Sequence, residues 1–195
     1  MNSSTPNQQI IFVDSSVQNY QSLIQGVDTN AKIVILNNNR SGIEQITQAL
    51  ASESNIQAVY ILSHGSEGSL KLGSDILNGN DIENFNTQIK QWGNTLTENG
   101  DILLYGCDVA AGDSGKNFVK RLSEITGADI AASDNLTGNA AKGGDWDLEI
   151  SCSAFKLHSQ NLIKFLWGGP YSPHEKCNLD VEQLSNRQDR SHRAV

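Results

Sequence analysis

Two short apolar segments, residues 58–62 and 102–105, constrain the fold more than any other feature of the chain. Both are rich in β-forming residues, and they end abruptly at Ser63-His64-Gly65 and at Gly106-Cys107-Asp108. Near-continuous apolar runs of this length are typical of strands buried on both faces of a parallel sheet. We therefore predict two such strands, whose ends present a histidine and a cysteine at one edge of the sheet.

Apolar patterns elsewhere in the chain extend this prediction to an alternating order of strands and helices. Further strands are expected at residues 10–13, 33–36, 129–132 and 146–150, helices at 15–26, 41–52, 82–96 and 118–126, and a small β-hairpin at 69–77. Such alternation favours an α/β fold, a three-layer α/β/α sandwich with a mostly parallel sheet. In sheets of this kind ligands bind at the carboxyl ends of the strands.

The 195 residues suffice for one substantial core, so one domain with flanking segments is expected. Residues 1–9 form a polar leader, residues 10–166 form the α/β domain, and residues 167–195 combine Gly, Pro and charged residues without periodicity. This composition predicts a disordered or weakly packed tail.

The charge and cysteine content exclude several classes of protein. The net charge is −8 and no cluster of Lys and Arg is present, so nucleic acid is not an expected partner. The three cysteines form neither a CxxC pair nor a disulfide framework, and we predict no metal and no cofactor. No apolar run reaches ~18 residues and no basic, apolar leader is present, so neither membrane insertion nor a Sec signal peptide is expected.

A thiol and an imidazole at neighbouring strand ends suggest nucleophilic catalysis by a Cys/His dyad. Cys107 follows Gly106 on a predicted tight turn into a helix, and a helix N-terminus favours the thiolate form. Gly65 allows the backbone to approach a substrate and to offer its N–H to a developing oxyanion. The alternatives are that Cys107 is an inert packing residue and that His64 only binds a loop.

Ser63, Asp108 and Asp134 lie beside the predicted dyad and are candidates for a substrate pocket. An acidic side chain there favours a basic residue at the P1 position of a peptide substrate. The alternative for both aspartates is a solvated loop carboxylate.

Four motifs together resemble a bacterial family of unknown function catalogued under number 4347. They are Ser63-His64-Gly65 and the segments at residues 105–112, 136–140 and 143–146, and the resemblance covers about residues 10–150. That family is similar in its His-Gly and Gly-Cys blocks to caspase-like cysteine peptidases of clan CD. It is typically the N-terminal module of large secreted or surface proteins of cyanobacteria and other Gram-negative bacteria.

The resemblance implies a cysteine endopeptidase in which His64 is the general base or acid and Cys107 is the nucleophile. The backbone N–H groups of Gly65 and Cys107 would form the oxyanion hole. The substrate would be a peptide or protein, including the parent chain, and the location extracellular or at the cell surface, with the cytoplasm as the alternative. The glutamine-alanine-cysteine string of true caspases is absent.

Two other functions remain open at this point. One is a noncatalytic adhesion or targeting module that keeps the same fold as a scaffold. The other is a cysteine-dependent acyl transferase or a redox protein that uses the same dyad. The sequence does not specify an oligomeric state.

Overall fold

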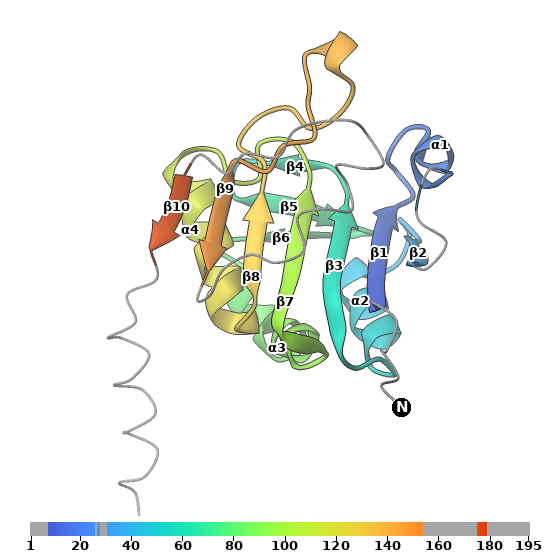
Figure 1. Cartoon of the computed structure of the whole chain (residues 1–195), viewed down its shortest axis with the longest axis vertical. Coiled ribbons are helices and arrows are strands. Elements are labelled where there is room, and N and C mark those ends of the chain that lie inside the picture. The colour runs from blue at the N-terminus through green and yellow to red at the C-terminus, as the bar shows by residue number, and fades with distance from the viewer. Residues whose placement is uncertain (1–7, 26, 28–30, 154–174, 179–195) are drawn as a thin grey trace, which may run out of the picture.

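A mostly parallel, seven-stranded mixed sheet forms the centre of the protein (Figure 1). The computed structural model describes residues 8–25, 27, 31–153 and 175–178. The sheet has the order β10-β9-β8-β7-β3-β1-β2. Its strands are β1 (Gln8–Asp14), β2 (Lys32–Leu36), β3 (Ile56–Leu62), β7 (Leu96–Tyr105), β8 (Asp129–Ala132), β9 (Ile150–Ser153) and β10 (Glu175–Asn178). The α/β prediction is confirmed at this level.

The helices alternate with these strands along the chain. They are α1 (Tyr20–Ile24), α2 (Gly42–Leu50), the 3-10 helix η1 (Ile82–Phe85), α3 (Asn86–Asn94), α4 (Gly112–Thr126) and the 3-10 helix η2 (Ala140–Lys142). Ser41 caps α2 by accepting from the Glu44 backbone N–H at 3.1 Å, as the capping-box spacing of these two residues predicts. Gly127, in the left-handed conformation at φ 71°, ends α4.

The central strands are buried on both faces because their side chains alternate between two apolar clusters. The larger cluster joins Ile10 and Phe12 of β1 to side chains of α2, α3 and α4. The smaller one joins Ile11 and Val13 of the same strand to Tyr60, with Leu23 of α1 packed against it. Adjacent residues of one strand thus serve opposite faces, which explains the near-continuous apolar runs.

A small antiparallel sheet projects after β3. It consists of β4 (Gly65–Ser66), β5 (Ser69–Leu72) and β6 (Asp75–Asn78), in that order. The predicted hairpin is confirmed as β5 and β6, which pair from Ser69↔Asn78 to Leu72↔Asp75. The additional strand β4 begins directly after His64, so the hairpin is attached to the candidate site.

Some element boundaries differ from the sequence prediction. Asn19 adopts a left-handed conformation at φ 57°, so α1 begins only at Tyr20 and not near residue 15 as predicted. The strand predicted at residues 146–150 lies later, as β9, which is not at the sheet edge because it pairs antiparallel with β8 and parallel with β10. Gln8 and Gln9 of the predicted leader belong to β1, and β10 lies within the predicted tail. The remainder of leader and tail lies outside the described residues.

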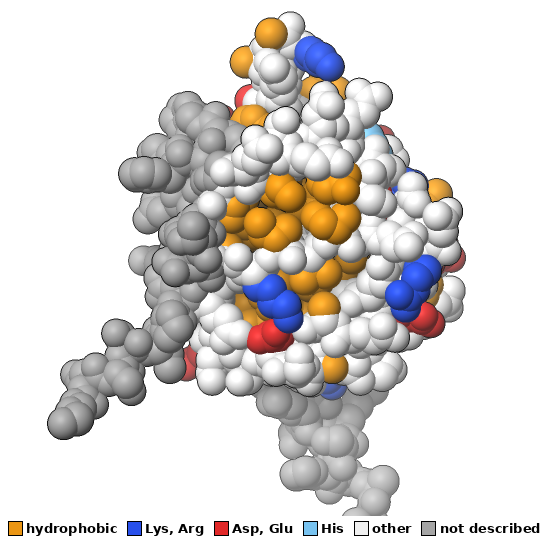
Figure 2. Space-filling view, turned by 90° about the vertical axis from the view of Figure 1, so that its right-hand side faces the viewer, with side chains coloured by type: hydrophobic (Ala, Val, Ile, Leu, Met, Phe, Trp, Pro, Cys, Tyr) orange, Lys and Arg blue, Asp and Glu red, His pale blue; other side chains and the backbone are white. Residues whose placement is uncertain are grey.

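Strand β2 forms one edge of the sheet and exposes apolar side chains. Ile33 is 36% exposed and Ile35 is 37% exposed. Figure 2 shows hydrophobic side chains gathered on the side of the molecule where β1, β2 and α1 lie.

Within the described part of the chain, none of the helices has the length and apolar character needed to cross a membrane.

Candidate cysteine-histidine site

The ends of β3 and β7 lie side by side, as predicted. The two strands pair in parallel up to Leu62↔Tyr105, and the Ser63 backbone N–H then donates to the Tyr105 carbonyl at 3.0 Å. Two residues beyond the Leu62↔Tyr105 pair, His64 and Cys107 follow at the same edge of the sheet. Parallel pairing therefore brings the histidine and the cysteine to neighbouring positions.

Two glycines allow the turns after these strands to approach each other closely. A Cβ atom at Gly65 would overlap the Val109 side chain and would lie only 2.7 Å from the Cys107 carbonyl oxygen. A Cβ atom at Gly106 would lie 3.2 Å from the Gly65 nitrogen. Any larger residue at Gly65 would therefore push the histidine turn away from the cysteine turn.

Cys107 occupies a tight turn between β7 and α4. The next residue, Asp108, is left-handed at φ 58°, and its N–H donates to the Asn135 carbonyl at 2.7 Å. The half-buried Cys107 thiol donates to the Thr137 carbonyl oxygen, with a separation of 3.7 Å. Cys107 is a free thiol, whereas Cys152 is disulfide-bonded, a bond that the spacing of the three cysteines did not predict. The loop after β8 thus lies against the candidate nucleophile.

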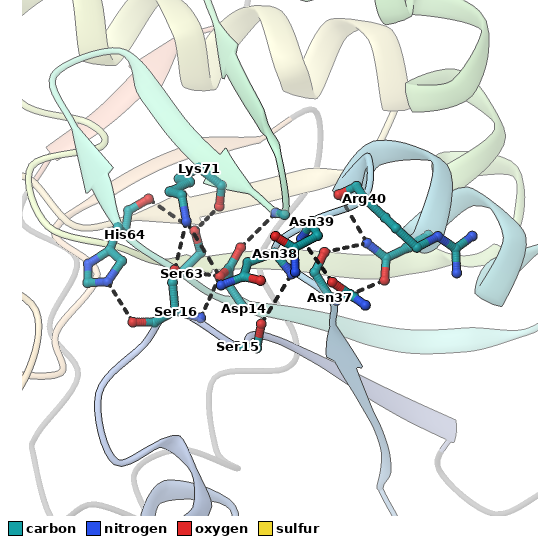
Figure 3. A network of polar contacts seen from close by, with 12 residues as sticks. Asp14, Ser15, Ser16, Asn37, Asn38, Asn39, Arg40, Ser63, His64 and Lys71 are labelled. Carbon is teal, nitrogen blue, oxygen red and sulfur yellow. Dashed lines mark hydrogen bonds and ion pairs between the residues drawn. The ribbon is translucent and has the colours of Figure 1, made fainter.

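His64 is exposed, and its ring is oriented by the backbone of a different strand end. The Nε2 atom lies 3.2 Å from the carbonyl oxygen of Ser16, in the turn after β1 (Figure 3). Because a carbonyl oxygen only accepts hydrogen bonds, Nε2 carries the proton in this contact. In the neutral ring Nδ1 is then unprotonated and available as a base.

The turn after β1 is held by Asp14, which is fully buried. Its Oδ1 atom accepts from the Ser16 N–H at 2.8 Å and from the Ser16 hydroxyl at 2.5 Å, and its Oδ2 atom accepts from the Gly73 N–H at 2.7 Å. The Lys71 ammonium donates to the Ser16 hydroxyl at 2.9 Å and lies 3.9 Å from Asp14 Oδ1. Figure 3 shows these groups gathered beside His64.

Three carboxylates lie near one another at the base of the loop that contacts Cys107. The Asn135 side-chain amide donates to Glu149 at 2.9 Å and to Asp145 at 3.4 Å, and the Asp134 N–H donates to Glu149 at 3.0 Å. Burial raises the pKa of Glu149, and the carboxylates of Asp134 and Asp145 also raise it. This carboxylate cluster, Asp134, Asp145 and Glu149, anchors the loop that carries Thr137.

The residues predicted for a substrate pocket lie in different environments. Ser63 is buried, and its hydroxyl donates to the carbonyl oxygens of Lys71 and His64, so it links β3 to the hairpin. Asp108 and Asp134 are half-buried beside the cysteine turn, joined through Asn135. Glu67 also lies near this turn, because a Cβ atom at Gly112 would stand 2.5 Å from its Oε1 atom.

The sequence prediction missed Asp14, Ser16 and Lys71 around the histidine, and Thr137 and Glu149 around the cysteine. One signal was available for Asp14, since it directly follows a buried strand, as the His64 and Cys107 segments do. Across the residues that the structure describes, no group of three or more His, Cys, Asp or Glu side chains is arranged to hold a metal ion.

Comparison with known proteins places the chain in a family without a known activity. No curated protein matches it. The family model described as "domain of unknown function (DUF4347)" matches residues 10–164. This range includes both strand ends and the loop that contacts Cys107, and it is most of the 195-residue chain. The protein therefore belongs to the DUF4347 family.

Proposed function

We propose that this protein is a caspase-like cysteine endopeptidase domain with a three-layer α/β/α architecture, in which His64 and Cys107 form the catalytic dyad. The main support is the contact between the two strand ends. Only glycine fits at Gly65, where a Cβ atom would lie 2.7 Å from the Cys107 carbonyl oxygen. A purely structural sheet edge does not require a free thiol and an exposed imidazole at such closely packed turns.

The chemistry follows from the orientation of the imidazole. With Nε2 held by the Ser16 carbonyl at 3.2 Å, Nδ1 of the neutral ring accepts the thiol proton. The thiolate attacks the scissile carbonyl carbon, and the backbone N–H groups of Gly65 and Cys107 stabilise the oxyanion. The imidazolium then protonates the leaving amine, and water hydrolyses the acyl-enzyme with His64 as the base.

In the resting state the thiol proton is directed to the loop. Cys107 donates to the Thr137 carbonyl at 3.7 Å, so its S–H bond must rotate before the proton reaches His64. Catalytic hydrogen bonds are often long or poorly aligned before substrate binds. The same contact favours the second candidate function, a noncatalytic adhesion or targeting module, if the loop keeps the thiol covered.

The surroundings of the dyad favour a basic P1 residue in a peptide or protein substrate. Asp108 and Asp134 are half-buried near Cys107, and Glu67 lies at the N-terminus of α4 beside the same turn. The family resemblance supports action on the parent chain or a neighbouring protein outside the cell or at its surface.

Active-site labelling tests the proposal. The full chain is treated with peptidyl acyloxymethyl ketones that carry Arg, Lys or Asp at P1, and wild type is compared with Cys107→Ala and His64→Ala. We expect labelling of wild type by the Arg and Lys probes, none of Cys107→Ala, and labelling of His64→Ala reduced by at least about 100-fold. Equal labelling of wild type and Cys107→Ala would refute the peptidase and leave the noncatalytic module.

A further inference from the structure

We propose that Asp14, acting through Ser16 and Lys71, is a positioning residue that fixes the imidazole of His64 for proton transfer. This inference rests on the peptidase function proposed above. It concerns residues from three separate elements: the end of β1, the turn after it, and strand β5.

The first step is the environment of Asp14. Its side chain is 0% exposed, and ionised carboxylates are buried only where hydrogen bonds and opposite charge compensate their lost hydration. Here three hydrogen bonds from Ser16 and Gly73 and the ammonium of Lys71 at 3.9 Å supply that compensation. The chain thus keeps a charged group in its interior directly beneath the turn that touches His64.

The second step is the conformation of Ser16. A carboxylate that accepts the N–H two residues ahead forms an Asx turn, which fixes the local backbone direction. In this turn the Ser16 N–H and hydroxyl point to Asp14, while its carbonyl oxygen reaches His64 Nε2 at 3.2 Å. The direction of the carbonyl therefore depends on the carboxylate.

The third step is a closed ring of hydrogen bonds that joins His64, Lys71 and Ser16 (Figure 3). The Lys71 N–H donates to the His64 carbonyl at 2.9 Å, and its ammonium donates to the Ser16 hydroxyl at 2.9 Å. Ser16 in turn holds the imidazole. His64 is thereby restrained at both its main chain and its ring, although its side chain is exposed and little packing restrains it.

The consequence for catalysis is the choice of tautomer. While the Ser16 carbonyl accepts from Nε2, the neutral ring keeps Nδ1 free as the base. Without this contact the exposed ring samples other rotamers and both tautomers, and only part of the population is competent. A positioning defect of this kind lowers kcat and leaves substrate binding largely unchanged.

The test combines the kinetics of hydrolysis of peptide amides that carry Arg or Lys at P1 with the NMR signature of the histidine tautomer in the full chain. Two-bond ¹H–¹⁵N spectra identify the protonated ring nitrogen, and the His64 signals are assigned by their loss in His64→Ala. The variants are Asp14→Asn, which keeps the size of the side chain but removes its charge, and Ser16→Ala, which keeps the carbonyl. Asp75→Asn is the matched control, because Asp75 also accepts from a serine hydroxyl and a backbone N–H, those of Ser41 and Ile43.

We expect wild type and Asp75→Asn to show the Nε2–H tautomer, and Asp14→Asn to show a mixture. The kcat of Asp14→Asn is expected to fall about 10- to 100-fold with KM within about twofold. Ser16→Ala keeps the buried carboxylate and its backbone hydrogen bonds, so it tests the ring of hydrogen bonds even if Asp14→Asn does not fold. The kcat of Ser16→Ala is expected to fall about 3- to 10-fold.

An unchanged His64 tautomer in both folded variants would overturn the inference, as would wild-type kcat in both. A kcat loss equal to that of Asp75→Asn would show a general effect on stability and would also overturn it. If wild type hydrolyses none of these peptide amides, the peptidase proposal fails, whereas the tautomer spectra still decide whether Asp14 and Ser16 orient His64.

Discussion

Replacement of Gly65 by alanine is the sharpest perturbation that the structure offers. The new Cβ atom would lie 2.7 Å from the Cys107 carbonyl oxygen and would overlap Val109, where ordinary contact begins at 3.4 Å. The carbonyl would have to retreat by about 0.7 Å to restore that contact. It belongs to the backbone of a turn that is hydrogen-bonded to the loop after β8, so the shift disturbs the whole cysteine turn.

Overpacking of this kind costs about 1–3 kcal/mol. The smaller entropy of the unfolded chain with alanine offsets about 0.4–1 kcal/mol of that cost. A net loss of about 1–2 kcal/mol lowers Tm by about 2–8 °C for a chain of this size. Because the same shift separates His64 from Cys107, the rate of Cys107 labelling is expected to fall about 100-fold.

Urea titrations and labelling kinetics measure both effects. Gly79→Ala is the control, because a Cβ atom there meets nothing within 4 Å, and its stability is expected to stay within about 0.5 kcal/mol of wild type. In Gly65→Ala/Val109→Ala the overlap with Val109 is gone, so the double variant should lose about 1 kcal/mol less than the sum of the single variants. Equal midpoints for Gly65→Ala and Gly79→Ala, or strict additivity, would refute the reasoning.

Two further predictions concern stability away from the dyad. Trp92 is buried, and its Nε1–H donates to the Thr47 hydroxyl at 2.8 Å. Thr47→Val leaves this N–H without its acceptor and should lower the free energy of unfolding in urea by about 1–3 kcal/mol. Thr47→Ser keeps the hydroxyl and should retain most of the stability. Burial raises the pKa of Glu149 in the folded state above the unfolded value of 4.5, so its protonation favours folding. The Tm of wild type relative to Glu149→Gln is therefore expected to be highest below pH 4.5 and to fall as the pH rises through the folded pKa; a pH-independent difference would contradict this.

The sequence was sufficient to locate the central strands and the candidate dyad. The apolar runs of β3 and β7 indicated burial on both faces, and the His64 and Cys107 segments marked where each run ends. These signals are local, because burial on both faces excludes polar residues from the strand itself. Parallel pairing then required the two ends to share an edge, and the register Leu62↔Tyr105 bears this out.

The predicted boundaries of helices and strands were wrong where the conformation of a single backbone residue sets the end of an element. The left-handed Asn19 shortens α1 and leaves Ser16 in a turn, where its carbonyl is free to meet His64. The pattern at residues 146–150 indicated a strand, but the antiparallel partner of β8 lies at Ile150–Ser153. Side-chain periodicity reports burial and not dihedral angles, so it does not show such displacements.

What the sequence determined by itself was the central strands, the main helices and the two reactive strand ends, because these depend on the apolar period of each segment. Only the tertiary structure decided which residues surround those two strand ends. β1 pairs with β3, which places Asp14 and Ser16 beside His64, and the loop after β8 brings the Thr137 carbonyl to the Cys107 thiol. These contacts join residues far apart in the chain, and their geometry depends on strand order and on turns rather than on any local pattern.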